Sequence, residues 1–137
     1  MTLYLETSAL LAWLLGEPRS REVISRINAA KTVVTSVVTL LEAERVLVRA
    51  EAQGILAAAD SQKLSGILAK AAKGWMLMEL SEQVRRRAAE RFPLEPVRTL
   101  DAVHLSTALI FTRAFPDLKL FTHDDRIRRN ALTLGLQ

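Results

Sequence analysis

Cysteine is absent from this 137-residue sequence. Its absence excludes disulfide bonds, thiolate metal sites and cysteine nucleophiles, and is typical of proteins from a reducing compartment. The longest apolar run near the N-terminus, residues 9–15, is far shorter than the roughly 20 residues of a membrane span. No basic stretch precedes that run, as one would in a signal peptide. We therefore expect a cytoplasmic protein that has no contact with a membrane.

Glycine and proline are also scarce, with five and four residues scattered singly along the chain. This scarcity excludes collagen-like repeats and low-complexity linkers. Half of the residues are apolar, and a chain of this length buries a substantial core. No composition shift divides the sequence, so we expect a single domain over residues 1–137.

Acidic residues are fewer than basic ones, at 15 against 19, which gives a net charge of +4 and a pI near 10.0. Most of the basic residues are Arg, whose planar guanidinium suits phosphate better than the ammonium of Lys does. A basic balance is typical of nucleic-acid-binding domains, although many basic domains bind none. Charge alone leaves this interpretation open.

Four short runs of strand type are separated by segments of helix length. The predicted strands are Thr2–Leu5, Thr32–Thr35, Trp75–Leu80 and Lys119–Thr122. The predicted helices are Ser8–Leu15, Ser20–Ala30, Val37–Gln53, Ala57–Ala72, Ser81–Phe92, Leu100–Arg113 and Asp125–Leu134. Strands separated by helices indicate crossover connections and a mainly parallel sheet. The predicted fold class is therefore α/β.

Acidic residues gather near the predicted strand ends, and ligands of open α/β sheets bind just beyond the carboxyl ends of the strands. The candidates are Glu6, Glu42, Glu44, Asp101, Asp124 and Asp125. Like charges held together raise one another's pKa and destabilise a fold unless a counter-charge is present. A set of oxygen ligands without cysteine suits a hard cation such as Mg²⁺ or Mn²⁺. Such an ion activates water for phosphodiester hydrolysis, so the cluster indicates a metal-dependent nuclease.

Each acidic residue also has a structural explanation. Asp101 lies in the first turn of a predicted helix, where the helix dipole favours a carboxylate by about 0.3–1 kcal/mol. Asp124 or Asp125 is suited to cap the last helix. Glu42 lies at the border of the apolar face of its helix and Glu44 nearer the middle, so helical geometry alone does not choose between them.

Polar residues next to these carboxylates carry two interpretations as well. His104 and His123 are near enough in sequence to face the site, but a histidine satisfied in the core or on the surface is the commoner case. Two His without Cys form no zinc signature. Thr7, Ser8 and Thr122 are typical cap and turn residues, and their hydroxyls are also suited to orient water on a metal ion.

Four stretches in sequence order resemble the PIN domain, in particular the small VapC-type ribonuclease toxins of bacterial toxin–antitoxin pairs. These stretches are "YLETSALLAWLL", "VVTSVVTLLEAERVLVR", "RTLDAVHLSTAL" and "LFTHDDRIRRNALTLGL". Together they span nearly the whole chain. The resemblance implies a three-layer α/β/α fold with a mainly parallel central sheet of about four to five strands.

The resemblance also selects among the acidic residues. The family has an acidic residue followed by Thr-Ser after the first strand, which matches Glu6. Its second acidic residue lies six positions after a Ser and three before an Arg, which matches Glu42 and not Glu44. The third and fourth match Asp101 and Asp124. By resemblance these four are catalytic, with Glu6, Asp101 and Asp124 as ligands of Mg²⁺ or Mn²⁺, and the substrate is RNA.

Glu6 departs from the family pattern, which ordinarily has Asp at that position. Its extra methylene lengthens the side chain by roughly 1.5 Å, while Mg²⁺ demands near-ideal octahedral oxygens at about 2.0–2.1 Å. The alternative to an active nuclease is therefore a PIN-like RNA-binding or regulatory module with weakened catalysis. A phospho-acceptor receiver domain fits poorly, because Lys119 precedes its strand and no Asp follows "WMLMEL". A non-catalytic interaction protein also remains open.

Partners follow from the same resemblance. Toxins of this type form homodimers and are neutralised by a small antitoxin. The helices expected at residues 9–15 and 57–72 are candidates to receive that antitoxin. Four arginines are candidate phosphate contacts for RNA, namely Arg85, Arg86, Arg126 and Arg129. For Arg85 and Arg86 the alternative is an ordinary solvated helix face.

Overall fold

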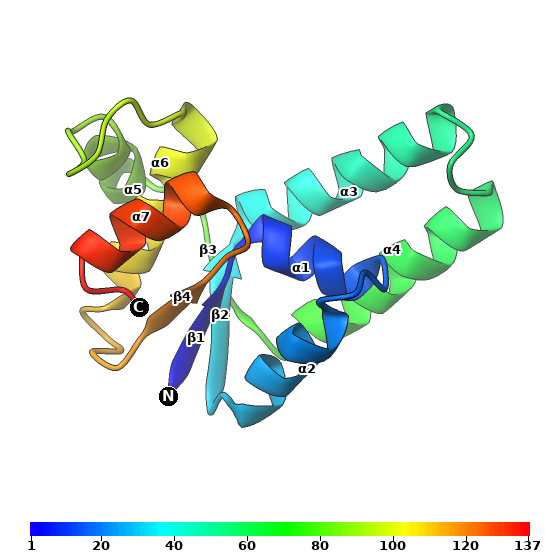
Figure 1. The fold of residues 1–137 in the computed structure, drawn as a ribbon, viewed down its shortest axis with the longest axis horizontal. Helices are drawn as coiled ribbons and strands as arrows, with labels where there is room; N and C mark the ends of the chain where they lie inside the picture. The colour runs from blue at the N-terminus through cyan, green and yellow to red at the C-terminus, as the bar shows by residue number, and fades with distance from the viewer.

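A computed structural model of residues 1–137 shows a four-stranded sheet between two layers of helices (Figure 1). The strands are β1 (Thr2–Leu5), β2 (Thr32–Ser36), β3 (Met76–Met78) and β4 (Lys119–Phe121). The helices are α1 (Thr7–Leu14), α2 (Ser20–Ala29), α3 (Val37–Ala52), α4 (Ala58–Ala72), α5 (Glu82–Ala88), α6 (Thr99–Phe111) and α7 (Asp125–Thr133). All strand pairs are parallel, in the order β3-β2-β1-β4. The predicted α/β class and parallel sheet are confirmed.

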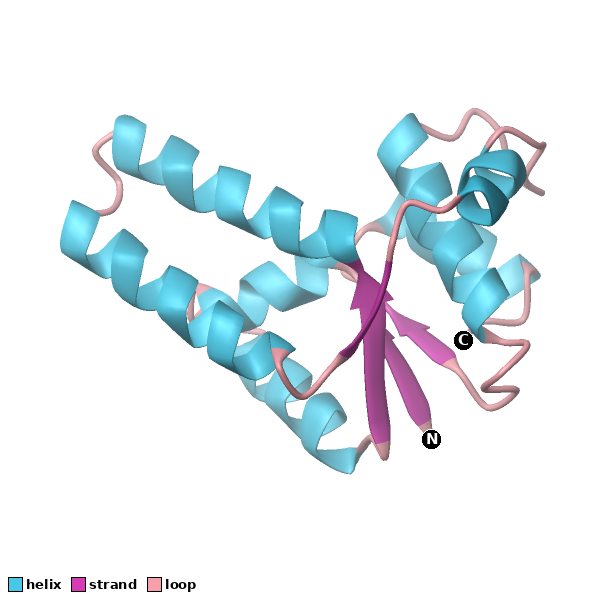
Figure 2. Ribbon diagram, turned by 180° about the vertical axis from the view of Figure 1, so that it is seen from behind, coloured by secondary structure: helices cyan, strands magenta, loops and turns pink.

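The two helical layers follow from the alternation of side chains along β1. Leu3 and Leu5 enter one apolar core, which α1, α2, α3 and α4 cover. Tyr4 points to the opposite face and enters a second core, which is built largely from α6 and α7, while α5 packs on α6. Successive strand residues face opposite sides of a sheet, so β1 is buried on both faces and lies at the centre of the molecule (Figure 2).

Two elements are shorter than predicted by three residues or more. The helix predicted over Ser81–Phe92 ends at Ala88, because the backbone N–H of Phe92 donates to Oε2 of Glu95 at 2.8 Å while the Phe92 ring enters the second core. The strand predicted over Trp75–Leu80 keeps only the three residues of β3, which lies at the edge of the sheet and pairs with β2 alone.

Helices α3 and α4 form an antiparallel pair that projects from the body of the molecule (Figures 1 and 2). The turn after α3 requires Gly54, whose φ is +71°. Its N–H donates to the carbonyl of Glu51, and the next N–H donates to the carbonyl of Ala50, which is the Schellman pattern that ends helices in a left-handed residue. None of the seven helices combines the length and apolar character that crossing a membrane requires.

Candidate active site

The candidate site lies at the carboxyl ends of β1 and β4, where the chain topology reverses. The chain leaves β1 first toward β2 and β3, and returns later to form β4 on the other side of β1. Connections that depart in opposite directions open a crevice at this switch point. A pocket of about 670 Å³ lies there. Its lining includes all four acidic residues that the family pattern selects, Glu6, Glu42, Asp101 and Asp124.

Glu6 leaves the end of β1 and caps the N-terminus of α1. Its Oε2 atom accepts three hydrogen bonds, from the Ser8 backbone N–H at 2.9 Å, the Ser8 hydroxyl at 2.5 Å and the Thr122 hydroxyl at 2.7 Å. Its Oε1 atom lies 4.0 Å from Nε2 of His104. Glu is not a usual capping residue, and here its extra methylene lets the carboxylate reach back over the first turn.

Glu42 extends from α3 into the pocket and is held by two donors. Its Oε1 atom accepts a hydrogen bond from the Thr7 hydroxyl at 2.8 Å and lies 2.6 Å from Nε2 of His104. On the far side of the imidazole ring, Nδ1 lies 2.9 Å from the hydroxyl of Tyr4. A carboxylate only accepts, so Nε2 of His104 carries the proton in the bond to Glu42. A buried chain of hydrogen bonds thus runs from Tyr4 through His104 to Glu42.

The pKa values at the two ends of this chain are both shifted. Burial, together with the negative charge of Glu6, raises the pKa of the Tyr4 phenol, which stays neutral. Partial burial acts to raise the pKa of Glu42, but the hydrogen bond and charge of His104 and the Thr7 hydroxyl outweigh it. The pKa of Glu42 therefore lies below its ordinary value of 4.5, and the carboxylate is ionised at neutral pH.

Asp101 and Asp124 share one cation. Arg98, just before α6, donates from Nε to Oδ2 of Asp101 at 3.1 Å, and its NH2 atom lies 3.7 Å from Oδ2 of Asp124. The hydrogen bond to Asp101 raises the pKa of Arg98. Asp124 also caps α7, because its Oδ1 atom accepts from the backbone N–H groups of Arg126 and Ile127 at 2.8 and 3.2 Å. The capping role that the sequence suggested for this position is thus present alongside its place in the pocket.

The neighbouring acidic residues point elsewhere. Glu44 accepts hydrogen bonds from the hydroxyl of Ser65 on α4, at 2.8 and 3.1 Å, and Asp125 is exposed and pairs with Arg128. Neither lines the pocket. The geometry therefore separates Glu42 from Glu44, which helical periodicity alone did not.

The expected metal cluster is not assembled in this structure. No three acidic or histidine side chains lie close enough together to hold a metal ion. Instead Asp101 and Asp124 pair with the cation of Arg98, and Glu42 is hydrogen-bonded to His104. The chemistry of the donors still fits a hard cation, since every carboxylate contributes oxygen and no thiolate is present.

The candidate RNA contacts fall into two groups. Arg126 and Arg129 line a second pocket, which adjoins the first and shares Asp101 with it. Arg85 and Arg86 lie on the exposed face of α5, outside both pockets, and Arg86 pairs with a glutamate one turn earlier at 3.0 Å. The position of Arg85 and Arg86 therefore matches the alternative of an ordinary solvated helix face.

Several site residues were not selected from the sequence. His104 is 1% exposed and satisfied in the core, as expected for a histidine there, yet it also contacts Glu42 directly. Arg98 precedes Asp101 by three residues, a spacing that places both on one face of a helix. Arg45 and Arg49 line the pocket, and the helical spacing from Glu42 would have identified them in the same way.

The cap of α7 yields a stability prediction. Asp124→Ala removes the oxygen that accepts the backbone N–H groups of Arg126 and Ile127 in the first turn of the helix and should lower the free energy of unfolding by about 1 kcal/mol. Asp124→Asn keeps a capping oxygen and should cost less. Urea unfolding of both variants measures the difference, and equal losses would contradict the capping role.

The lowered pKa of Glu42 predicts a pH dependence. A carboxyl group whose pKa is lower in the folded state than in the unfolded state stabilises the fold above its unfolded pKa, and this contribution is lost as the pH falls. The free energy of unfolding of the wild type, minus that of Glu42→Gln, should therefore decrease as the pH falls below the ordinary value of 4.5. Urea titrations at a series of pH values give this difference. A difference independent of pH would contradict the assignment.

Known proteins match this chain over almost its full length. The PIN domain profile matches residues 3–132. Ribonuclease VapC46 of Mycobacterium tuberculosis is 33% identical over 135 residues, which cover 98% of this chain and 93% of the relative. Ribonuclease VapC35 of the same species is 29% identical over 136 residues, with the same coverage of both chains.

Solved structures share the fold. The crystal structure of VapC20 from Mycobacterium tuberculosis, a sarcin-ricin loop cleaving toxin, has a TM-score of 0.70 at 15% identity and covers 98% of this chain and 96% of that one. VapBC2 from Rickettsia felis, bound to a DNA fragment from its promoter, has a TM-score of 0.65 at 14% identity and covers 95% and 93%. The profile match and the 33% identity show membership of a family and not only a shared fold. The chain belongs to the PIN domain family and, within it, to the VapC group.

Proposed function

We propose that this chain is a metal-dependent endoribonuclease, the toxin of a toxin–antitoxin pair. The observation that carries the proposal is the convergence of four carboxylates, from four separate parts of the sequence, on one pocket at the switch point of the sheet. They are Glu6, Glu42, Asp101 and Asp124. The relatives VapC46 and VapC35 are named ribonucleases, which supports RNA as the substrate.

We propose Glu6, Asp101 and Asp124 as the ligands of Mg²⁺ or Mn²⁺. When bound, such an ion polarises the phosphate and lowers the pKa of water. Glu42 stands apart from these three, because His104 and Thr7 hold it in place and keep it ionised. A positioned carboxylate of this kind accepts a proton from the attacking water. Ser8 and Thr122 act through Glu6, because their hydroxyls donate hydrogen bonds that orient its carboxylate.

One feature favours a second candidate, an RNA-binding or regulatory module with weakened catalysis. Three hydrogen bonds already engage Oε2 of Glu6. Only Oε1 is left for a ligand, on a side chain one methylene longer than the family's usual Asp. This candidate predicts that Glu6→Asp cleaves RNA faster than the wild type.

The experiment that tests the proposal measures cleavage of a labelled single-stranded RNA by the purified chain, with Mg²⁺, with Mn²⁺ or with EDTA. We expect cleavage only with metal. Asp101→Asn should reduce the rate by more than about 100-fold, because even outer-shell partners of a metal ligand contribute 10–100-fold. Asp60→Asn, which removes an exposed carboxylate on α4, is the matched control and should cleave as the wild type does.

The outcomes separate the two candidates. Cleavage that requires metal and Asp101 supports the nuclease. A silent wild type with an active Glu6→Asp variant supports the weakened module. If neither chain cleaves the RNA under any metal condition, the nuclease proposal is rejected and RNA binding alone is left.

We also propose two partners, a second copy of this chain in a homodimer and a small antitoxin. The proposal is based on similarity to toxin–antitoxin proteins. One of these is a toxin–antitoxin complex from Klebsiella pneumoniae, which has a TM-score of 0.60 at 20% identity and covers 90% of this chain and 87% of that one. Of the two candidate docking helices, α1 buries most of its apolar residues in the core, whereas α4 leaves Ile67 exposed.

We expect light scattering at micromolar concentration to give twice the chain mass of 15.2 kDa. A monomeric mass would contradict the dimer.

A further inference from the structure

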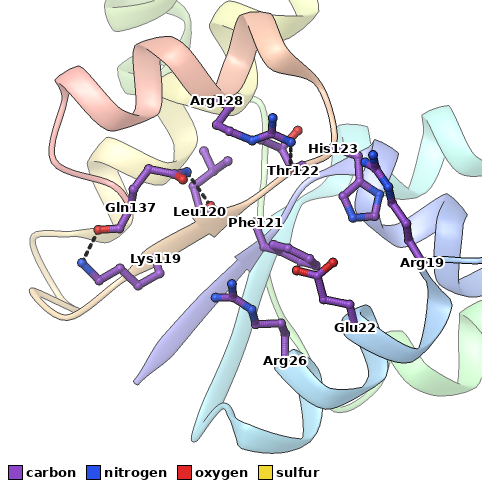
Figure 3. A pocket seen from close by; sticks show the side chains of 10 residues that line it. All are labelled: Arg19, Glu22, Arg26, Lys119, Leu120, Phe121, Thr122, His123, Arg128 and Gln137. Atoms are coloured by element: carbon purple, nitrogen blue, oxygen red, sulfur yellow. Dashed lines mark hydrogen bonds between the residues drawn. The ribbon is translucent and has the colours of Figure 1, made fainter.

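A pocket rich in cations lies where α2, β4 and α7 meet (Figure 3). We call it the basic pocket; its volume is about 580 Å³. Four cationic side chains and one carboxylate line it, namely Arg19, Arg26, Lys119, Arg128 and Glu22. The cations come from the segment before α2, from α2, from β4 and from α7, so only the folded chain brings them together.

Two of these arginines are held in place. The guanidinium of Arg26 lies over the Phe121 ring, 5.0 Å from its centroid, a cation–π arrangement. Arg128 pairs with Asp125 and donates from NH2 to the carbonyl oxygen of Thr122 at 3.2 Å. Arginines that are already positioned lose less side-chain entropy when they bind a planar or tetrahedral anion.

The positive charge of the basic pocket is not balanced from within. Arg128 has a carboxylate partner and Lys119 donates to the backbone oxygen of Gln137, whereas Arg19 and Arg26 form no ion pair, and Glu22 is the single acidic side chain in the lining. Cations that converge on a cavity repel one another and raise the local concentration of anions. His123 lines the same cavity, and its Nε2 atom has no hydrogen-bond partner.

The basic pocket and the candidate active site share one short segment. Asp124 lines the active-site pocket, and the residue before it, His123, lines the basic pocket. Arg126 and Arg129 line another cavity, which shares Asp101 with the acidic pocket. Two cation-lined cavities thus adjoin the acidic pocket, one at Asp101 and one at the His123–Asp124 peptide. A nucleic-acid strand carries one negative charge per nucleotide, so its phosphates next to the acidic pocket would meet these cations.

We propose that the basic pocket binds a backbone phosphate of single-stranded RNA, adjacent to the phosphate at the acidic pocket. The choice of RNA as the ligand rests on the proposed function. The charge and geometry of the cavity are independent of that function. Arg19 and Arg26 are the principal contacts, Arg128 assists, and Glu22 opposes binding.

The test measures the affinity of a labelled single-stranded RNA by fluorescence anisotropy in EDTA, where no metal-dependent cleavage intervenes. The chain with both Arg19→Gln and Arg26→Gln is compared with a chain carrying Lys70→Gln and Arg113→Gln. The control removes the same charge from exposed positions outside every cavity described. We expect the pocket variant to bind several-fold more weakly than the control, with a salt dependence shallower by about 0.7 for each phosphate that it no longer neutralises.

A gain of affinity tests the proposal independently of any folding defect. Glu22→Gln removes the one acidic side chain of the basic pocket and should tighten RNA binding. Glu51→Gln, which removes an exposed carboxylate at the end of α3, is its matched control. A misfolded chain does not bind more tightly, so this result requires an intact pocket.

The outcomes distinguish this proposal from the nuclease. Equal affinity and equal salt dependence of the pocket variant and its control would overturn the phosphate site, even if the wild type cleaves RNA with metal. Weaker binding by the pocket variant, together with tighter binding by Glu22→Gln, supports it. If the same wild type cleaves no RNA with Mg²⁺ or Mn²⁺, the nuclease is rejected while the phosphate site stands.

Discussion

The hydrogen bonds to Oε2 of Glu6 join the ends of β1 and β4, and the geometry of the pocket depends on them. β1 is one of the two interior strands, and β4 lies beside it across the switch point. The hydroxyl of Thr122 reaches Glu6 from the end of β4, and Ser8 reaches it from α1. Because Ser8 also accepts the N–H of His123, the same network fixes where the β4–α7 connection begins. That connection places Asp124 on one side and His123 on the other.

Charge is the second constraint on this region. Four carboxylates in one pocket require compensation; Arg98 provides part of it as a cation, and His104 contributes a hydrogen bond to Glu42. His104 is fully buried and linked to Tyr4, so its contact with Glu42 is built into the second core and not into a mobile surface. Arg98 is 65% exposed and much freer to move. A cation that binds the carboxylates therefore competes with Arg98 more readily than with His104.

Much of the fold was predictable because it depends on local patterns. Each of the four strands and seven helices lies where an apolar run or a helical periodicity indicated it. The errors were at ends governed by contacts distant in sequence or by sheet position: α5 stops where Phe92 turns into the core, and β3 is short because it pairs on one edge only. Among the acidic residues, the family pattern chose Glu42, and the structure places Glu44 against α4. The absence of a preassembled metal cluster was not predictable.

The sequence by itself determined the element order, the parallel sheet and the acidic positions near the strand ends, because periodicity and strand boundaries are properties of neighbouring residues. Only the tertiary structure decided the partners of those side chains. Glu6 meets Thr122 across 116 positions and Glu42 meets His104 across 62. The basic pocket likewise exists only where α2, β4 and α7 meet. Such contacts depend on how layers pack against the sheet, and no local pattern records which polar atoms the packing will bring within hydrogen-bond distance.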